Sequence, residues 1–464
     1  MTGRGGGQDG APDGAPDGAS GATRRGFFGR VAGLAVAGAA LTAETGAPAL
    51  AKTDPAAPTT DAQIEPFWGK NQGGIVTPSQ GYTYFAALDL TTEKREDVVA
   101  VLKAWTNAAA RLAGGKPIDA FTRTELAYNY DTSTTVTTTS SEPTPTTVSL
   151  SDSGEAEGLP PSRLTLTFGF GAGLFEKDGK DRYGLAKHRP AALIDLPHFA
   201  GDELAAQQTG GDLSVQACAD DPQVAFHAVR QLIRLADDVA QVRWAQTGFL
   251  PKFAPGTPPR NLMGFRDGTN NPSTADPAAM DKVIWVGDEG PDWMSGGSYM
   301  VARRIRIALE HWDKSKLGLQ EQTFGRHKAS GAPLGMKSEK DALDLDATDK
   351  DGNYVIAENA HVRLAAAASN DGAQILRRPY SYNDGVNFTA ERWPPWRQGM
   401  EYDAGLFFIC YQRDPRTGFV KLFEKMAKLD MLNQFVTHVG GGLFAIPPGA
   451  AQGEFIGQHL FAGA

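Results

Sequence analysis

Two stretches far apart in the chain decide the expected fold: LSVQACADDPQVAFHAVRQLIRL at residues 213–235 and GLFFICYQRDPRTGFVKLFEKMAKL at residues 405–429. In each, an apolar, strand-like run with a cysteine leads into Asp-Pro, and a phenylalanine follows four residues after the proline. An acidic cap with proline at the first helical position explains each Asp-Pro locally. It does not explain why the same elements recur in the same order. The repeat predicts two homologous α+β halves, each an antiparallel β-sheet with helices packed on one face.

Other patterns fit this scheme. In the first half, residues 83–90 (TYFAALDL) are strand-like, and residues 95–114 carry apolar side chains at helical spacing. In the second half, residues 298–309 are strand-like and residues 316–327 are helix-like. We therefore expect two ferredoxin-like domains.

The domain boundaries follow from shifts in composition. The N-terminal ferredoxin-like domain is expected at residues 65–255, and the C-terminal one, which carries the chemically informative motifs, at residues 256–464. A Ser/Thr-rich tract at residues 132–158 interrupts the first domain. Its composition is typical of a flexible surface insertion.

The overall composition describes an acidic globular protein. The chain has 464 residues, 41% of them hydrophobic, a net charge of −9 and a pI near 5.5. This length and apolar content suffice for a sizeable core, whereas the acidic balance argues against nucleic-acid binding. Cys218 and Cys410 each end an apolar run. Buried reduced thiols are expected there, with a disulfide between them left open.

The first 51 residues have the pattern of an export signal. Residues 1–22 are rich in Gly, Ala, Asp and Pro and cannot form a core. After them come Arg24-Arg25, the apolar run 31–41 and a small-residue ending at Ala51. This order predicts a twin-arginine signal peptide, the alternative being a chance arginine pair before an Ala-rich linker. The apolar run is short for a bilayer span, so no stable transmembrane segment is expected after processing.

The stretch MGFRDGTNNP at residues 263–272 places one carboxylate, Asp267, among turn-forming residues. Glycine, asparagine and proline explain a turn. They do not explain the Phe-Arg pair before the acid. Asp267 is either an ordinary turn residue or an acid held rigidly over a reactive centre.

A second informative segment is ENAHVRLAAAASNDGAQILRRPYSY, residues 358–382. We expect an extended backbone around His361 and Arg363, which would point the two side chains to the same face of the strand. A polar turn at residues 369–372 would then bring Arg377 and Arg378 back toward them.

One imidazole, one carboxylate and several arginines are the groups that a haem peroxidase needs. Iron takes a histidine as its proximal ligand, and propionates attract cations. On the opposite face, an acid–base group moves the peroxide proton while a cation stabilises the developing negative charge.

The motifs GFRDGTNNP, ENAHVRLA and ILRRPYSY, in this order, resemble those of the dye-decolourising (DyP-type) peroxidases, in the branch of exported deferrochelatase/peroxidase-like proteins. NQGGIVTP at residues 71–78 also fits, as do the two repeated stretches. The likeness runs from about residue 65 to the C-terminus. It implies a haem b cofactor, hydrogen peroxide as oxidant and small-molecule electron donors.

The resemblance also assigns roles by residue. It makes Asp267 the distal acid–base residue, Arg377 the distal arginine and His361 the proximal ligand of the haem iron. Arg363 and Arg378 are expected to bind haem, although Arg378 could instead pair with a surface carboxylate. Asp403 is the candidate for the acidic partner of His361, with Glu358 as competitor; His327, in a glycine-rich loop, is an improbable ligand.

The route of electrons from bulky donors is a separate hypothesis. Trp393, Trp396 and Tyr402 cluster in RWPPWRQGMEY. They could relay oxidising equivalents from a closed pocket to the surface, or they could serve only in packing.

Two other functions stay open at this stage. The same pocket would serve a deferrochelatase that releases iron from haem and leaves the porphyrin intact. A non-haem binding module of two ferredoxin-like halves would bind no porphyrin. The expected location is extracellular or periplasmic, after export by the twin-arginine machinery, and a homo-oligomer is left open.

Overall fold

The computed structural model describes residues 63–127, 144–252, 257–390 and 398–462. Residues 57–464 form one compact unit. The expected export signal and most of the expected linker, residues 52–64, lie outside the described ranges. Within these ranges, no helix combines the length and the apolar character needed to cross a membrane.

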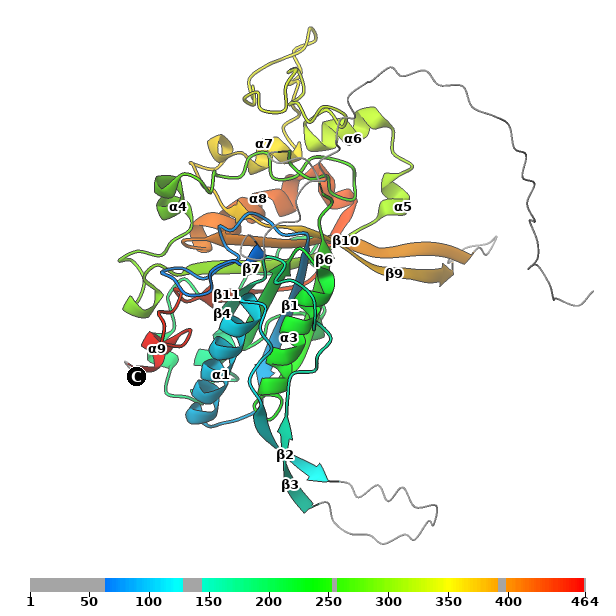
Figure 1. Cartoon of the computed structure of the whole chain (residues 1–464). Helices are drawn as coiled ribbons and strands as arrows, with labels where there is room; N and C mark the ends of the chain where they lie inside the picture. The colour runs from blue at the N-terminus through cyan, green and yellow to red at the C-terminus, as the bar shows by residue number, and fades with distance from the viewer. Residues whose placement is uncertain (1–62, 128–143, 253–256, 391–397, 463–464) are drawn as a thin grey trace, which may run out of the picture. The chain divides into compact units, whose positions relative to one another are not determined.

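Strands and helices of different lengths follow one another along the chain (Figure 1). The strands are β1 (Tyr82–Leu90), β2 (Phe121–Ala127), β3 (Thr144–Leu150), β4 (Thr165–Phe170), β5 (Leu213–Ala219), β6 (Ala240–Phe249), β7 (Ser298–Ile307), β8 (Leu376–Arg377), β9 (Tyr380–Ala390), β10 (Gln398–Gln412) and β11 (Val436–Ile446). The α-helices are α1 (Arg95–Ala113), α2 (Ala172–Phe175), α3 (Pro222–Ala236), α4 (Pro277–Val283), α5 (Leu309–Trp312), α6 (Leu317–Phe324), α7 (His361–Ala365), α8 (Lys421–Leu429) and α9 (Gln458–Ala462).

One nine-stranded antiparallel sheet runs through the structure, and we call its two four-stranded parts the first and the second sheet. The first has the order β4-β5-β1-β6 and the second has the order β11-β7-β10-β9, with β8 added on β10. The sheets join at two narrow seams, Ala445 with Phe170 and Phe249 with Ser381. Together they form a closed, barrel-like arrangement. The expectation of an antiparallel α+β protein is therefore confirmed.

Aromatic side chains fill the space between the two sheets. Phe85 of β1 lies 4.8 Å from Trp244, 5.5 Å from Phe407 and 5.9 Å from Phe444, measured between ring centroids. These four residues belong to strands of both sheets and are buried. Because strand side chains alternate between faces, the remaining apolar residues point outward and need a second layer to cover them.

Helices α1 and α3 supply that layer for the first sheet. They lie side by side on its outer face (Figure 1). The Trp105 indole nitrogen of α1 donates to the Leu232 carbonyl of α3 over 2.7 Å, and Trp105 packs on Phe168 of β4. As the sequence indicated, Asp221 caps α3 by accepting from the backbone nitrogens of two following residues. The outer face of this sheet is thus filled.

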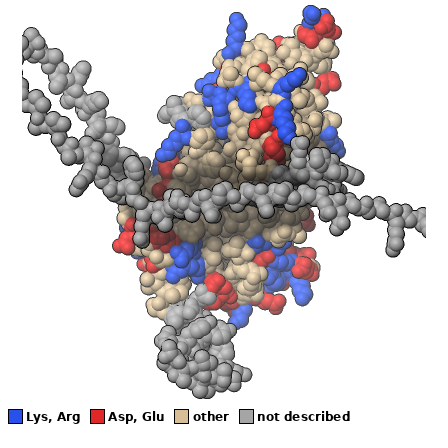
Figure 2. All heavy atoms as spheres, turned by 90° about the vertical axis from the view of Figure 1, so that its right-hand side faces the viewer, with Lys and Arg blue, Asp and Glu red and all other residues tan. Residues whose placement is uncertain are grey.

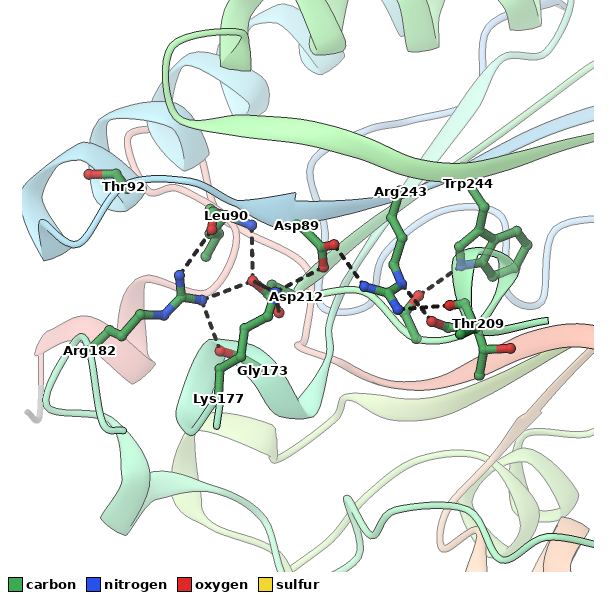
Figure 3. A network of polar contacts seen from close by, with 12 residues as sticks. Asp89, Leu90, Thr92, Gly173, Lys177, Arg182, Thr209, Asp212, Arg243 and Trp244 are labelled. Atoms are coloured by element: carbon green, nitrogen blue, oxygen red, sulfur yellow. Dashed lines mark hydrogen bonds and ion pairs between the residues drawn. The ribbon is translucent and has the colours of Figure 1, made fainter. Parts of the chain in front are cut away.

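A charge network centred on the buried Asp212 lies at the end of β1 that carries Asp89 and Leu90 (Figure 3). The Asp212 carboxylate accepts from Arg182 over 2.9 Å, from Lys177 over 3.0 Å and from the backbone nitrogen of Leu90 over 2.9 Å. Asp89 accepts from the same lysine and from Arg243. Since Lys177 and Arg182 follow α2, the network holds that segment against β1 and β5.

The second sheet is covered differently. The connection that leaves β7 runs through residues 308–375 and contains only short helices, α5, α6 and α7. These lie with α8 above the sheet (Figure 1). No helix as long as α1 covers this face within the described residues.

The structure corrects two local expectations. His361 and Arg363 lie in α7 rather than in an extended segment. The Ser/Thr-rich tract contributes a strand, β3, paired along its length with β2. The two cysteines are free: Cys218 faces the space between the sheets and Cys410 the opposite side of the second sheet.

Surface charge is mixed rather than polarised. On the face shown in Figure 2, lysines and arginines are interspersed with aspartates and glutamates. A nucleic-acid-binding surface would be predominantly basic. Neither this face nor the net charge of −9 has that character.

Candidate active site

A cavity of about 610 Å³ lies on the outer face of the second sheet. Its volume is within the usual range for a cofactor or ligand site. Apolar side chains from β7, β10 and the segment around α8 form much of its lining: Ile305, Ile307, Leu406, Phe408, Phe419, Leu422, Phe423 and Met426. Asp267, Arg377 and His361, the three residues on which the sequence prediction depends, all line this one cavity.

The GFRDG loop holds Asp267 by backbone contacts. The Asn261 side chain accepts from the backbone nitrogens of Met263 and Phe265, and the Asp267 nitrogen donates to the Pro259 carbonyl over 2.8 Å. Gly268 has φ of 95°, a conformation that a residue with a Cβ rarely adopts. The turn residues thus fix the position of the acid, and the side chain of Asp267 is only 12% exposed.

Asp267 and Arg377 form an ion pair. Arg377 Nη1 donates to Asp267 Oδ1 over 2.8 Å. The Asn271 side chain donates to the Arg377 carbonyl and accepts from its backbone nitrogen, which ties β8 to the loop. A carboxylate and a guanidinium are therefore held together at one wall of the cavity.

His361 is oriented by a carboxylate and by an aromatic ring. Its Nδ1 lies 2.7 Å from Asp430 Oδ2, and its ring packs edge-on against Phe324 at 5.9 Å. Phe265 stacks on Phe324 at 3.9 Å, so the segment that carries Asp267 also supports the imidazole. With Nδ1 engaged, Nε2 is the ring nitrogen left for a ligand.

Asp430 was missed by the sequence analysis. It lies between α8 and the next turn, where its Oδ1 accepts from the Leu432 nitrogen over 2.9 Å. The prediction that Asp403 is the partner of His361 is wrong, because Asp403 is bound by Arg304 over 2.8 Å and does not line the cavity. The competitor Glu358 is exposed.

Arg363 and Arg378 do not reach the cavity in this structure. Because α7 is a helix, Arg363 does not share the direction of His361, as it would in a strand. It donates instead to the Ile356 and Leu345 carbonyls. Arg378 lies on the opposite face of its strand from Arg377, between the two sheets. Their expected contact with haem is therefore not supported.

Two further cavity residues escaped notice. Arg326 is buried and donates to the Gly331 carbonyl over 2.7 Å; burial lowers its pKa. Its neighbour His327 was considered, but it is 41% exposed and pairs with Glu321. His438 lines the cavity floor, and burial together with Arg303 lowers its pKa to about 3. In the sequence, only the FGRHK segment could have indicated that Arg326 lies in the cavity. The sequence of β11 contains no pattern that would indicate His438.

The relay hypothesis is largely untested. Trp393 and Trp396 lie outside the described residues. Tyr402 is half-buried on β10. It does not line the cavity.

An imidazole oriented by a carboxylate and an acid–arginine pair that line one apolar cavity define an enzyme site of the peroxidase type. Comparisons with known proteins agree with this class. The C-terminal model of the Dyp-type peroxidases matches residues 258–451, and the N-terminal model matches residues 72–250. The chain therefore belongs to the Dyp-type peroxidase family.

Individual relatives cover nearly the whole chain. A dye-decolorizing peroxidase from Thermobifida fusca is 36% identical, over 96% of this chain and 98% of its own length. A deferrochelatase from Escherichia coli (strain K12) is 33% identical, over 85% and 87%. The solved structure of ferric DtpA from Streptomyces lividans is 38% identical, covers 88% of this chain and 100% of its own, and has a TM-score of 0.74.

Proposed function

We propose that this chain is an exported, haem b-dependent peroxidase that reduces hydrogen peroxide and oxidises bulky aromatic or dye-like donors in one-electron steps. The observation that carries the proposal is the pairing of His361 with Asp430 in the same cavity as the ion pair of Asp267 and Arg377. Family membership and the named activity of the Thermobifida relative support it.

The residues present fit a haem. The cavity has the volume and apolar lining of a cofactor site, and His361 has one ring nitrogen left for iron. Arg326 is a buried cation on the lining and is suited to a propionate. The description of the Streptomyces lividans relative as ferric supports an iron cofactor.

The bound haem would supply the redox chemistry at iron. Asp267, held beside Arg377, would accept the proton from one peroxide oxygen and return it to the other, which leaves as water when the O–O bond breaks. Arg377 stabilises the negative charge that develops as the O–O bond breaks. Asp430 orients His361, and this hydrogen bond would strengthen the donation of Nε2 to a haem iron.

An absorption spectrum of the purified, haem-loaded protein tests this function directly. A Soret band that shifts with one equivalent of hydrogen peroxide and recovers when an electron donor is added is the expected result. A Soret band that does not shift when peroxide is added would exclude peroxidase activity. The lack of any Soret band after reconstitution with haem would exclude haem binding.

The alternative is a deferrochelatase, favoured by the name of the Escherichia coli relative. It would use the same cavity, so the products separate the two functions. Metal-free porphyrin recovered intact from haem would support the deferrochelatase, whereas oxidised donor formed at the expense of peroxide supports the peroxidase.

We infer a second site for bulky donors. A smaller cavity of about 340 Å³ is lined by aromatic residues, among them Tyr84, Phe226 and Tyr382. Tyr382 also packs on Arg304 of β7, at 4.5 Å, while the next residue of that strand, Ile305, lines the first cavity. If Tyr382→Phe oxidises dye and consumes peroxide at the same rates as the parent protein, this route is excluded.

Two structural proposals accompany the function. The strand orders β4-β5-β1-β6 and β11-β7-β10-β9 support two ferredoxin-like halves, with the boundary near residues 255–256. The arginine pair and apolar run of residues 1–51 support twin-arginine export to the periplasm or the cell exterior. Replacing Arg24 and Arg25 by lysine should retain the precursor inside the cell. A homo-oligomer stays a prediction, and sedimentation of the purified protein would test it.

A further inference from the structure

The consecutive residues Arg377 and Arg378 point to opposite sides of the second sheet. Arg377 reaches the cavity. Its neighbours Leu376 and Tyr380 are buried between the sheets, and Arg378, on the same side as they are, is 4% exposed. The backbone nitrogen of Arg378 donates to the Ile409 carbonyl of β10, which fixes this alternation. A second guanidinium therefore lies directly behind the one that faces the cavity.

Arg378 has no carboxylate partner among the described residues. Its guanidinium donates to the Thr77 carbonyl and to the side-chain oxygen of Gln80. Its Nε is buried without a hydrogen-bond partner. A buried charge without a counter-ion is strongly unfavourable and is therefore rare unless the site requires it.

The surroundings do not remove the charge. Burial acts to lower the pKa of Arg378, yet its pKa is raised and the guanidinium stays charged. Tyr380, Tyr411 and Cys218 lie beside it, and Cys218 forms a side-chain hydrogen bond with it. Burial raises the pKa of both tyrosines. They stay neutral phenols and do not neutralise the guanidinium.

The other buried arginines differ. Arg303 is bound by Asp202 over 3.2 Å, and Arg304 by Asp384 and Asp403. Arg326 lies close enough to Glu339 for that carboxylate to raise its pKa, against the lowering by burial. Among these four, Arg378 is the one without a carboxylate beside it in the described part of the chain, and its hydrogen-bond partners include the Cys218 sulfur.

We propose that Arg378 is a positioning residue for the peroxidase reaction: its uncompensated charge, held behind Arg377, makes the cavity electrostatically positive and so favours anions and the reduced cofactor there. The inference rests on the proposed function, because it concerns the same cavity. Arg378 does not touch peroxide or cofactor and acts only through its field.

The charges on the cavity wall are nearly balanced. One additional charge nearby therefore has a large effect on the electrostatic potential in the cavity. The titratable lining residues are Arg266, Asp267, Arg326, Lys340, Asp341, His361, Arg377, Asp430 and His438. Arg266 pairs with Glu339, and Arg377 with Asp267. At an effective dielectric constant near 20, a charge on the order of 10–15 Å away changes an anion-binding or reduction equilibrium roughly sixfold to sixteenfold.

The test uses the haem-loaded protein and two equilibria. Azide is titrated into the ferric form, and the reduction potential is measured by spectroelectrochemistry. Arg378→Met, with Arg378→Gln as a second neutral variant, should weaken azide binding roughly sixfold to sixteenfold. The same factor corresponds to a fall in potential of about 45–70 mV, since a tenfold change for one electron is about 59 mV. Arg378→Lys should restore both values.

Two controls separate the field from a structural effect. Carbon monoxide, a neutral ligand of the ferrous form, should bind all variants alike. Cys218→Ser changes the same site without changing its charge and should leave azide binding as in the parent. Tighter azide binding by Cys218→Ser would show that the thiol carries the missing negative charge and would overturn the proposal.

The remaining outcomes also decide. Neutral variants that fold, load haem and bind azide as the parent does would overturn the role of Arg378 and leave the proposed function intact. A parent protein without a Soret band would instead overturn both.

Discussion

The outer faces of the two sheets begin from similar sequences and end differently. In both halves a cysteine-containing strand runs into Asp-Pro and a helix. In the first half, Phe226 is 45% exposed and α3 packs directly on its sheet. In the second, Phe419 is buried and lines a cavity of about 610 Å³. The repeated segments alone therefore do not determine whether a face is filled or hollow.

The connections make the difference. In the first half β1 leads almost at once into α1, a helix of 19 residues that covers the sheet. In the second half the corresponding connection, residues 308–375, has only short helices and carries His361 to the cavity. The helix after Asp414-Pro415 also starts differently, with a π-helical turn at Arg416–Val420. Such turns are frequent at functional sites.

The largest expected effect concerns the chemistry of the hollow face. Asp267→Asn should retain haem but slow the reaction with hydrogen peroxide by about 10²–10⁴, because the amide cannot shuttle the proton. Stopped-flow measurement of the first peroxide-dependent change of the Soret band gives the rate. Asp403→Asn is the matched control, since this acid lies outside the cavity. A rate for Asp267→Asn within the scatter of the control would remove Asp267 from the mechanism.

The difference between filled and hollow faces can itself be measured by one substitution made twice. Leu232 is fully buried beneath α1, whereas Leu406 borders the cavity. In haem-free protein, Leu232→Ala should lower the free energy of unfolding by about 2–5 kcal/mol. Leu406→Ala should lower it by less than about 2 kcal/mol, because a side chain beside an empty space loses fewer contacts.

Urea denaturation followed by circular dichroism gives both values. Equal losses for the two variants would mean that the second face is packed as tightly as the first in solution.

A smaller effect is expected from the carboxylate that orients the histidine. Asp430→Asn should weaken haem binding by about 10–100-fold, since partners of metal-binding histidines typically contribute that much. Haem titration followed at the Soret band measures the affinity. Glu358→Gln provides the control, because Glu358 is exposed beside α7. If Asp430→Asn binds haem as tightly as the parent does, the 2.7 Å contact between His361 Nδ1 and Asp430 Oδ2 has a structural role only.

The sequence anticipated the residues that lie within contiguous motifs. Asp267 and Arg377 sit where local turn chemistry and strand alternation put them, and His361 lines the same cavity. Asp430 could not be found in this way, because it is 69 residues from His361 and resembles an ordinary helix-capping acid. The prediction for Arg363 failed for a local reason. It assumed a strand period of two, whereas α7 has the helical period.

The smallest expected effect is a pH dependence of stability that comes from the hollow face. His438 is buried there, and burial and Arg303 lower its pKa to about 3, against about 6.5 in the unfolded chain. The folded protein therefore binds no proton at His438 between these values, while the unfolded chain does. Stability must fall as pH falls below about 6.5, by roughly 2 kcal/mol at pH 5.

Replacing His438 with leucine should remove this part of the acid sensitivity. His459, whose side chain is 63% exposed, supplies the control, since His459→Leu should keep the parental dependence. Urea midpoints at pH 7.5 and pH 5 for the three proteins measure the slope. If His438→Leu loses as much stability between the two pH values as the parent does, the imidazole is hydrated in solution. The floor of the cavity would then be open to water, and the hollow face would be less sealed than the structure indicates.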